Sequence, residues 1–445
     1  MKICNPWKLF AEWQGRRPRL RRRSPALVAS IAAEVLEERR LLTAGNVNLA
    51  VSPLGDITLT STDANNPDVT MTRSGGTVVF TGSSGTQINY AQTQSAQLIV
   101  AIPAVRNITL NLGTGEDLFA MSGLSTTGDV TVNGKSSGFA NIQIFADVVN
   151  TDVVIGGSIV ANFGGEATSF YLVALKSNLS VNGSVSLAEA GPGSKATFLY
   201  GGTSAGNQRL QINGDVNIVD RGTGTDYFSI KGQTTINGNV SFDNSRNSAA
   251  DNYVTIGVLH GAAPTIHGSL TLALSHQVSS GGRVILGTDS QTADAGRLIV
   301  DGPTVIKCGN ASDNIDINEA LFKSSVTINT GSSPGPGLNW DLVQINASEF
   351  DGPVSIKMLG PSAHLELAGD QRFLTPTEFK QKVTVSSTGP GAVVRLAQVN
   401  AQPLLIFGAN VLFTGGKPAG KLFIGGLYSA NPKLFRLVHF VFANG

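Results

Sequence analysis

Cysteine, charge and helical periodicity are all scarce in this sequence. Only two cysteines, Cys4 and Cys308, occur in 445 residues, and charged residues make up 14%. With Cys4 in a basic leader, the body holds one thiol and can form no internal disulfide, so its stability must come from packing. Cys308 lies in an alternating apolar stretch, where a buried core position is favoured over a reactive thiol. After about residue 45 no long segment repeats apolar residues every 3.6 positions, which argues against a helical protein.

Motifs of the common enzyme classes are also missing from the sequence. None of the five histidines stands in a His-Glu-x-x-His spacing, and neither a Gly-x-Ser-x-Gly elbow nor a phosphate loop occurs. We therefore assign no catalytic residue, no cofactor and no enzyme activity from sequence. The Arg run at 16–23 has no basic or aromatic support in the body, so we expect no nucleic-acid partner. No apolar run is long enough to cross a bilayer, and we expect no transmembrane span.

Glycine, by contrast, is abundant at 52 residues, and much of it falls in a repeated module. An apolar residue, a variable one, usually Gly, another variable one and then Val, Ile or Leu recur down the chain. The best copies are Val181–Val185, Ile212–Val216, Ile236–Val240, Ile266–Leu270, Val300–Val305 and Phe350–Val354, and looser ones centre on Arg106, Gly128, Gly157, Ser324, Gln381 and Gly408. Successive centres are 22 to 34 residues apart. Fixed-period self-similarity of this kind indicates a solenoid.

A second apolar run follows each module, as at 170–175 and 227–230, so each repeat holds at least two short strands. We therefore predict an all-β protein: a right-handed parallel β-helix of about 11 to 12 irregular rungs over residues 101–445. The hand is taken from other parallel β-helices. Stacked asparagines at 133, 182, 213 and 237 would form an amide ladder in one bend.

Antiparallel hairpin arrays are the competing fold, because Asn-Gly between apolar alternations also favours a tight hairpin turn. Against hairpins, two copies carry a proline, Pro303 or Pro353, where a hairpin strand would lose a ladder hydrogen bond. A bend between two faces of a coil tolerates proline better, which favours the β-helix.

The two ends of the body differ from its middle. Residues 46–100 alternate polar and apolar residues between tight connections, which predicts a small β-meander that caps the first rung. The apolar stretch 434–442 is predicted to cover the last rung as a capping strand; the alternative is an exposed edge that pairs with another molecule.

Residues 1–45 form a basic leader with a net charge of +6, predicted to be helical or disordered. It ends in Leu36-Glu37-Glu38-Arg39-Arg40-Leu41-Leu42. This stretch resembles the Leu-Glu-x-Arg-x-Leu-Leu element near the N-termini of many extracellular proteins of planctomycete bacteria; Glu38 departs from the Pro or Asp often found there. The resemblance implies export to the bacterial cell surface or outside, with 1–45 as an export or sorting leader. A plain amphipathic helix is the alternative, and the two can coexist.

The nearest approach to a metal motif is Gly113-Thr114-Gly115-Glu116-Asp117, echoed at 222–226 and more loosely at 309–313. It resembles half of the nonapeptide that binds calcium in parallel β-rolls. Asp117 and Asp226 are thus weak calcium candidates, because carboxylates and Gly carbonyls suit this hard cation. Since the copies are isolated, a turn closed by its own Asp is the favoured interpretation.

Glycan cleavage would need paired carboxylates at equivalent places in nearby rungs. Asp301 and Asp351 are such a pair, two rungs apart with Ser324 between them, and Asp226 with Asp251-Asn252 is a nearer equivalent. Low charge argues against a catalytic strip. The sequence therefore predicts an exported structural or adhesive solenoid with surface glycans or other surface proteins as partners. A carbohydrate-active β-helix of the polysaccharide lyase or hydrolase type, or a calcium-binding β-roll-like surface protein, are the alternatives.

Overall fold

The computed structural model describes residues 45–424 except 62–65, 84, 135–137, 166, 204–205, 247–251, 275–281, 289–295, 310–312, 332–340, 361–362, 369, 371–372, 374, 388–391, 397–404 and 416–420, and without the side chains of 415 and 421–424. Residues 1–44 of the predicted leader and the predicted capping strand at 434–442 lie outside this set. Every regular element in the described ranges is a β-strand. None of these ranges contains a helix of the length and apolarity needed to cross a membrane.

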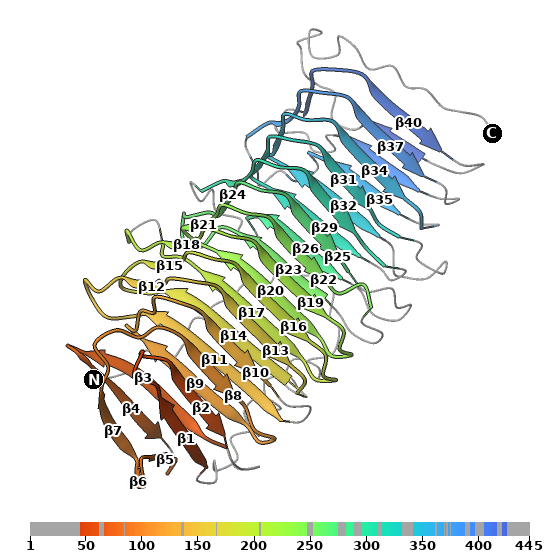
Figure 1. Cartoon of the computed structure of the whole chain (residues 1–445). Coiled ribbons are helices and arrows are strands. Elements are labelled where there is room, and N and C mark those ends of the chain that lie inside the picture. The colour runs from red at the N-terminus through yellow and green to blue at the C-terminus, as the bar shows by residue number, and fades with distance from the viewer. Residues whose placement is uncertain are drawn as a thin grey trace. The chain divides into compact units, whose positions relative to one another are not determined.

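The body is a parallel β-helix, as the repeat predicts (Figure 1). A complete coil runs through a strand of a first, a second and a third sheet, and each strand pairs in parallel with its equivalent in the next coil. The first sheet holds β8 (Ile108–Asn111), β10 (Val130–Asn133), β13 (Ile159–Phe163), β16 (Val185–Glu189), β19 (Val216–Asp220), β22 (Val240–Asp243), β25 (Leu270–Ala273), β28 (Thr304–Lys307), β31 (Val326–Asn329), β34 (Val354–Met358), β37 (Val383–Ser387) and β40 (Val411–Gly415).

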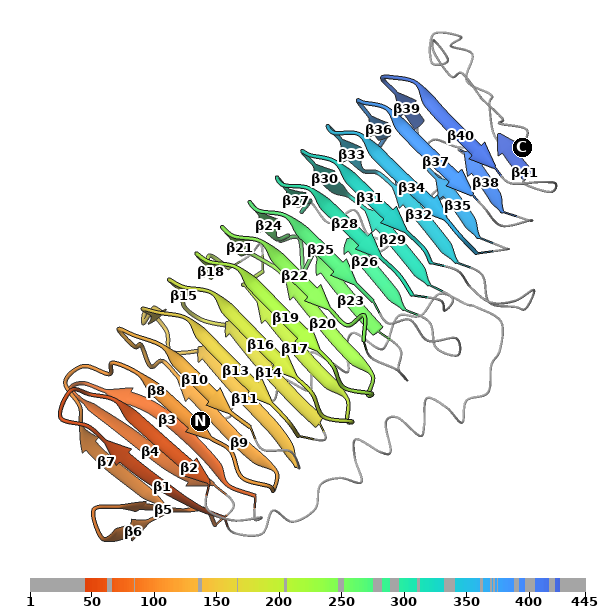
Figure 2. The ribbon, with the colours of Figure 1, turned by 45° about the vertical axis from the view of Figure 1, so that its right-hand side comes forward.

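The second and third sheets follow the same order along the stack (Figure 2). The second holds β9 (Asp117–Ser122), β11 (Phe139–Ala146), β14 (Ala167–Ala174), β17 (Lys195–Tyr200), β20 (Asp226–Lys231), β23 (Asn252–Gly257), β26 (Arg283–Gly287), β29 (Asn314–Asn318), β32 (Leu342–Asn346), β35 (His364–Leu367), β38 (Val393–Leu396) and β41 (Lys421–Ile424). The third holds β12 (Val153–Ile155), β15 (Leu179–Val181), β18 (Leu210–Ile212), β21 (Thr234–Ile236), β24 (Thr265–Ile266), β27 (Leu298–Val300), β30 (Ala320–Phe322), β33 (Glu349–Phe350), β36 (Thr377–Phe379) and β39 (Leu405–Phe407).

Twelve parallel strands from β8 to β40 thus mark the coils of the first sheet in the described ranges, and ten of these coils also carry a third-sheet strand. The parallel stacking that the repeat predicts is confirmed, and antiparallel hairpin arrays are excluded as the fold of the body. The right hand of the coil stays a prediction.

Seven strands precede the regular coils in the predicted cap: β1 (Asn46–Val51), β2 (Ile57–Ser61), β3 (Asp68–Ser74), β4 (Thr77–Ser83), β5 (Gln87–Tyr90), β6 (Thr93–Ser95) and β7 (Gln97–Ala101). Most of their pairings are antiparallel, for example β1 with β2 and β3 with β4. The block joins the coils through parallel pairs of β2 with β8 and β3 with β9. Antiparallel strands here extend both the first and the second sheet.

The Gly module forms the bend between the third and the first sheet. In Val181-Asn182-Gly183-Ser184-Val185, Val181 ends β15 and Val185 begins β16. Neighbouring coils approach so closely at this bend that a Cβ on Gly268 would lie 2.4 Å from the Gly238 carbonyl oxygen. The sterics explain why most copies keep glycine.

Proline fits this bend because its carbonyl keeps a partner. The Pro303 carbonyl accepts from Leu270 N–H at 3.0 Å, and the Pro353 carbonyl accepts from Val326 N–H at 3.0 Å. Each proline directly precedes a strand, β28 or β34, so its missing N–H removes no hydrogen bond from a strand.

Inside the coils runs one continuous apolar core, from Val47 in the N-terminal block to Phe413 in β40. Strands alternate buried and outward residues, so each coil contributes Val, Ile, Leu or Phe to the same interior. In the third sheet Phe322, Phe350, Phe379 and Phe407 stack at ring-centroid distances of 5.1, 4.7 and 5.3 Å. Because each coil packs on its neighbours, the core grows with coil number without widening.

Candidate functional site

Most of the buried charged side chains in the described ranges lie at the corner between the first and the second sheet, which we call the polar corner. One inward column comes from the ends of first-sheet strands, where Glu189 and Asp220 are in register. A facing column comes from the starts of second-sheet strands, where Lys195 and Asp226 are in register. The polar corner comprises Asp117, Thr168, Glu189, Lys195, Asp220, Asp226, Asn244, Asn252, Cys308, Asp313 and Asp341, all of them buried.

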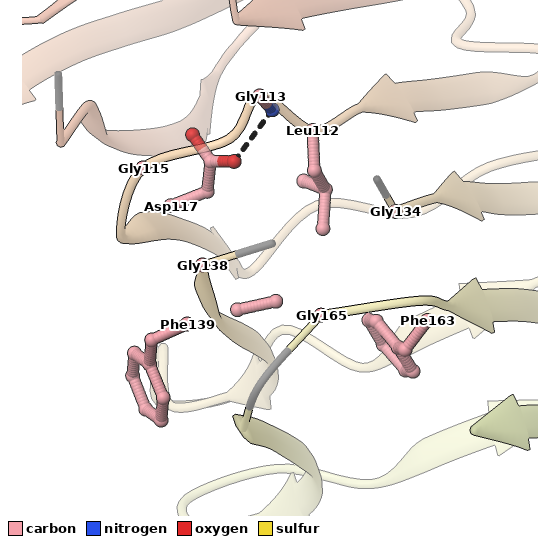
Figure 3. A pocket seen from close by; sticks show the side chains of 10 residues that line it. Leu112, Gly113, Gly115, Asp117, Gly134, Gly138, Phe139, Phe163 and Gly165 are labelled. Carbon is pink, nitrogen blue, oxygen red and sulfur yellow. Dashed lines mark hydrogen bonds between the residues drawn. The ribbon is translucent and has the colours of Figure 1, made fainter. Parts of the chain in front are cut away.

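Asp117, the first calcium candidate, closes its own turn. Its Oδ2 accepts a hydrogen bond from Gly113 N–H at 2.6 Å, beside a small cavity that Leu112 and Phe163 help to line (Figure 3). The cavity has about 10 Å³ of space, near the least that one water molecule needs. A Cβ on Gly138 would lie 2.1 Å from the Gly115 carbonyl oxygen, so glycines shape this turn. The arrangement is that of an Asp that caps its own backbone.

Asp226, the second candidate, lies in a different part of the polar corner, beside a buried lysine. Lys195 Nζ lies 3.6 Å from Asp220 Oδ1 and 4.0 Å from Asp226 Oδ1, and it donates to the Gly193 carbonyl at 2.6 Å. Asn244 donates to the other oxygen of Asp226. The ammonium of Lys195 thus occupies the place between the two carboxyl groups that a bound cation would take.

Two carboxyl groups near Lys195, those of Glu189 and Asp226, have pKa values well above the usual range for carboxylic acids. Burial raises the pKa of Glu189 to about 8, helped by the nearby charge of Asp220. Burial raises the pKa of Asp226 to about 9, and the hydrogen bond and charge of Asp220 act in the same direction. Thr168 donates to Glu189 at 3.0 Å. Acids shifted in this way cluster at functional sites, although buried structural networks produce the same shifts.

Further along the same corner, Asp313 and Asp341 satisfy the backbone of neighbouring coils. Asp313 Oδ1 accepts from Gly282 N–H at 2.9 Å, and Asp341 Oδ1 accepts from Asp313 N–H at 3.2 Å. Burial raises the pKa of Asp313 to about 8 and that of Asp341 to about 6. Cys308 is buried in the apolar core beside them, which confirms the core interpretation, and burial raises its pKa well above the ordinary value.

The calcium candidates are not brought together. Asp117 begins β9 and Asp226 begins β20, with β11, β14 and β17 between them in the second sheet. In the described part of the chain no three His, Cys, Asp or Glu side chains are grouped so as to hold a metal ion. Calcium binding at Asp117 and Asp226 stays an untested alternative to the favoured turn interpretation.

A second polar feature, the outer ladder, runs along the bend between the third and the first sheet. Its members directly follow the eight third-sheet strands from β15 to β36: Asn182, Asn213, Asn237, His267, Asp301, Lys323, Asp351 and Lys380. Asn213 donates to Asn182 at 3.3 Å and Asn237 donates to Asn213 at 2.8 Å. The amide ladder predicted for these three residues is confirmed. Asn133 is not part of it, because it ends a first-sheet strand and donates to Asn111 at 3.0 Å.

The proposed acid pair Asp301 and Asp351 belongs to this ladder. The residue between them is Lys323, not Ser324 as predicted, and its Nζ lies 2.8 Å from Asp301. His267 Nδ1 lies 2.6 Å from the same carboxylate, and Lys380 Nζ lies 2.8 Å from Asp351. Partial burial acts to raise the pKa of Asp301, but hydrogen bonds and charge from Lys323 and His267 bring it below its usual value.

A general acid needs the opposite shift, so the surroundings of Asp301 disfavour it in that role. In the other proposed pair, Asp251 lies outside the described residues, and the in-register neighbour of Asp226 is Asn252.

A third feature, the aromatic face, is the outer side of the second sheet over β14 to β23: Tyr171, Phe198, Tyr200, Tyr227 and Tyr253, all half-buried. Four of the six tyrosines of the chain lie here. Tyr171 stacks on Phe198 and Tyr227 on Tyr253, both at 5.0 Å, and the Tyr200 hydroxyl donates to Ser229 at 3.1 Å. These stretches were predicted as apolar strands, but the outward direction of their aromatic residues was not predicted. Alternation with Phe170, Leu199, Phe228 and Val254 was the available signal.

Beyond the aromatic face the same sheet surface carries charge. Arg283 lies 3.2 Å from Asp316, and Arg395 lies 2.8 Å from Glu366. The outer side of the second sheet therefore divides into an aromatic, hydroxyl-bearing half and an ion-paired half.

The class defined by this geometry is the parallel β-solenoid. No family model, no curated protein and no solved structure matches the chain.

Proposed function

We propose that the protein is exported and serves as a structural and adhesive β-solenoid at the bacterial cell surface or outside the cell, without catalysis of its own. The resemblance of residues 36–42 to an element of exported planctomycete proteins supports export. The outer ladder supports a structural role, because its charged and amide side chains form ion pairs and hydrogen bonds with side chains of neighbouring coils. Surface glycans are the proposed partner class.

The observation that carries the adhesive part is the aromatic face. Its outward side chains are tyrosine and phenylalanine with Thr255 among them, so the surface is amphipathic and largely uncharged. Tyrosine suits such contacts because it offers apolar area and a hydroxyl group at a small entropy cost. Sugars also combine apolar C–H patches with hydroxyl groups. A neutral glycan is therefore the ligand that this face fits best.

A binding screen of the full chain against a glycan array and insoluble neutral polysaccharides tests the proposal. The double variant Tyr227→Ala/Tyr253→Ala is expected to weaken binding by about tenfold or more, since that corresponds to about 1.4 kcal/mol of lost contact. Tyr90→Ala, in the N-terminal block, is the matched control and should bind as the parent does. Equal binding by the double variant would contradict the assignment of this face, and release of oligosaccharides would contradict the non-enzymatic role.

A further inference from the structure

Lys195 is the most unusual side chain of the interior. Only 2% of its surface is exposed, and it is among the largest fully buried side chains of the protein. A buried lysine is rare unless it is paired, and the desolvation cost of such a pair is seldom repaid in full by its attraction. Its Nζ points at the two carboxyl groups of Asp220 and Asp226 within one enclosed corner.

From this geometry we propose that Lys195 and Asp226 form an intramolecular amide bond, which covalently joins two adjacent coils. Both residues begin second-sheet strands, β17 and β20, and are direct partners in the parallel ladder. Adjacent strands lie about 4.8 Å apart, a gap that an amide between a lysine and an aspartate side chain can span. The bond requires no cofactor, because its parts are already in place.

The chemistry is a condensation of an amine with a carboxylic acid. Asp220 accepts a proton from the Lys195 ammonium, and the neutral amine Nζ then attacks Cγ of Asp226, whose carboxyl group carries a proton. Protonated Asp220 then gives its proton to a hydroxyl oxygen of the tetrahedral intermediate and takes one from the nitrogen. The C–O bond breaks, one water molecule leaves, and Asp220 ends the reaction protonated. An N–C bond replaces a C–O bond, and no oxidation or reduction takes place.

Three features of the site favour this reaction. Proximity makes the step unimolecular, since Nζ lies 4.0 Å from Asp226 Oδ1 within the same buried corner. Burial keeps Asp226 protonated, consistent with its raised pKa, and a neutral acid is a far better acceptor than a carboxylate. The hydrogen bond from Asn244 holds the carboxyl group of Asp226 in place.

Asp220 is the natural proton carrier rather than the acceptor of the new bond. Its Oδ1 accepts from Gly222 N–H at 2.7 Å and lies 3.6 Å from Lys195 Nζ, within reach of the proton to be moved. It belongs to the first sheet, so it faces the ladder pair from across the corner. Glu189, one coil earlier, adds a second buried acid to the same enclosure.

Mass spectrometry of the denatured, full-length parent protein tests the proposal without any substitution. The expected intact mass is one water molecule below the value calculated from the sequence. Tryptic digestion should then yield a branched peptide that joins residues 177–209 to residues 222–231, because an acylated Lys195 is no longer cleaved. An unmodified mass with free peptides 177–195 and 222–231 would overturn the proposal. A branch to residues 210–221, which contain Asp220, would overturn the assignment to Asp226.

Two variants and a control sharpen the assignment. Lys195→Met keeps much of the side-chain volume without the amine, and Asp226→Ala removes the acceptor; both should show the full calculated mass and no branched peptide. Asp215→Ala changes an exposed aspartate and should keep the branch. If either variant fails to fold, the mass of the parent protein still decides the question.

Discussion

Replacing Phe350 by alanine should destabilise the third sheet around β33. The side chain is fully buried and stacks on Phe322 at 5.1 Å and on Phe379 at 4.7 Å. Loss of a buried phenylalanine typically costs about 3–5 kcal/mol, and each aromatic pair adds about 0.5–1.5 kcal/mol beyond burial. Since Phe350 belongs to two such pairs, we expect a loss near the upper end of the range for a buried phenylalanine, about 4–5 kcal/mol.

Hydrogen exchange measured along the chain is the appropriate assay, because each coil of a solenoid contacts only its neighbours. Protection should fall in the strands on either side of β33, from β27 to β39, and change little in β9 to β17. Phe198→Ala is the matched control: this ring is half-buried and stacks on Tyr171 at 5.0 Å, so its loss should cost only about 1–2 kcal/mol. An equal cost for the two variants, or an even loss of protection along the whole stack, would refute the reasoning.

Three further outcomes are expected. Burial raises the pKa of Asp313 from 3.8 to about 8, so between these pH values the folded protein keeps a proton that the unfolded chain releases. The free energy of unfolding should therefore fall as pH rises through this range, by at most about 1.4 kcal/mol per pH unit. Asp313→Asn should flatten this pH dependence in urea unfolding, and an unchanged slope would contradict the interpretation. Cys308 should resist alkylation in the folded protein and react once urea unfolds it, as peptide mapping would show; rapid labelling of the native protein would count against its burial. Gly302→Ala would place a Cβ 2.6 Å from backbone atoms of Gly268 and should cost about 1–3 kcal/mol by thermal unfolding, whereas Gly76→Ala meets nothing within 4 Å and should be close to neutral.

The coil architecture could be predicted from sequence because one bend has the same steric demand in every coil. Close approach of neighbouring backbones at the third-to-first-sheet bend favours glycine, and the demand recurs once per turn. Asn133 shows where a local pattern misleads. Val132-Asn133-Gly134 reads like Val181-Asn182-Gly183, yet its Val and Asn are the last two residues of the first-sheet strand β10, so it lies at a different corner. The same short sequence can therefore occupy different positions within a coil, and only the strand pairing along the whole chain shows which position it occupies.

The polar corner was only partly foreseen, for a similar reason. The Gly-x-Gly-x-Asp turns pointed to Asp117 and Asp226 but not to Lys195, although Gly191-Pro192-Gly193-Ser194-Lys195 is the same turn with lysine in the place of aspartate. Comparing the last residue of this turn between coils would have placed opposite charges side by side. The predicted equivalent of Asp301 in the next coil, Ser324, is wrong by one residue, because the copy at 323–325 lacks the glycine that marks the register.

In-register pairing also makes the coils interchangeable units. Val185 and Val216 hold equivalent places in successive first-sheet strands. Excising residues 185–215 would therefore join Ser184 to Val216 and leave β13 beside β19, β14 beside β20 and β15 beside β21, each with a partner of matching phase. Duplication of such a segment would lengthen the molecule just as readily. Unequal recombination within a gene of this kind can thus change the length of the encoded β-helix by whole coils, while the first and last coils keep their sequences.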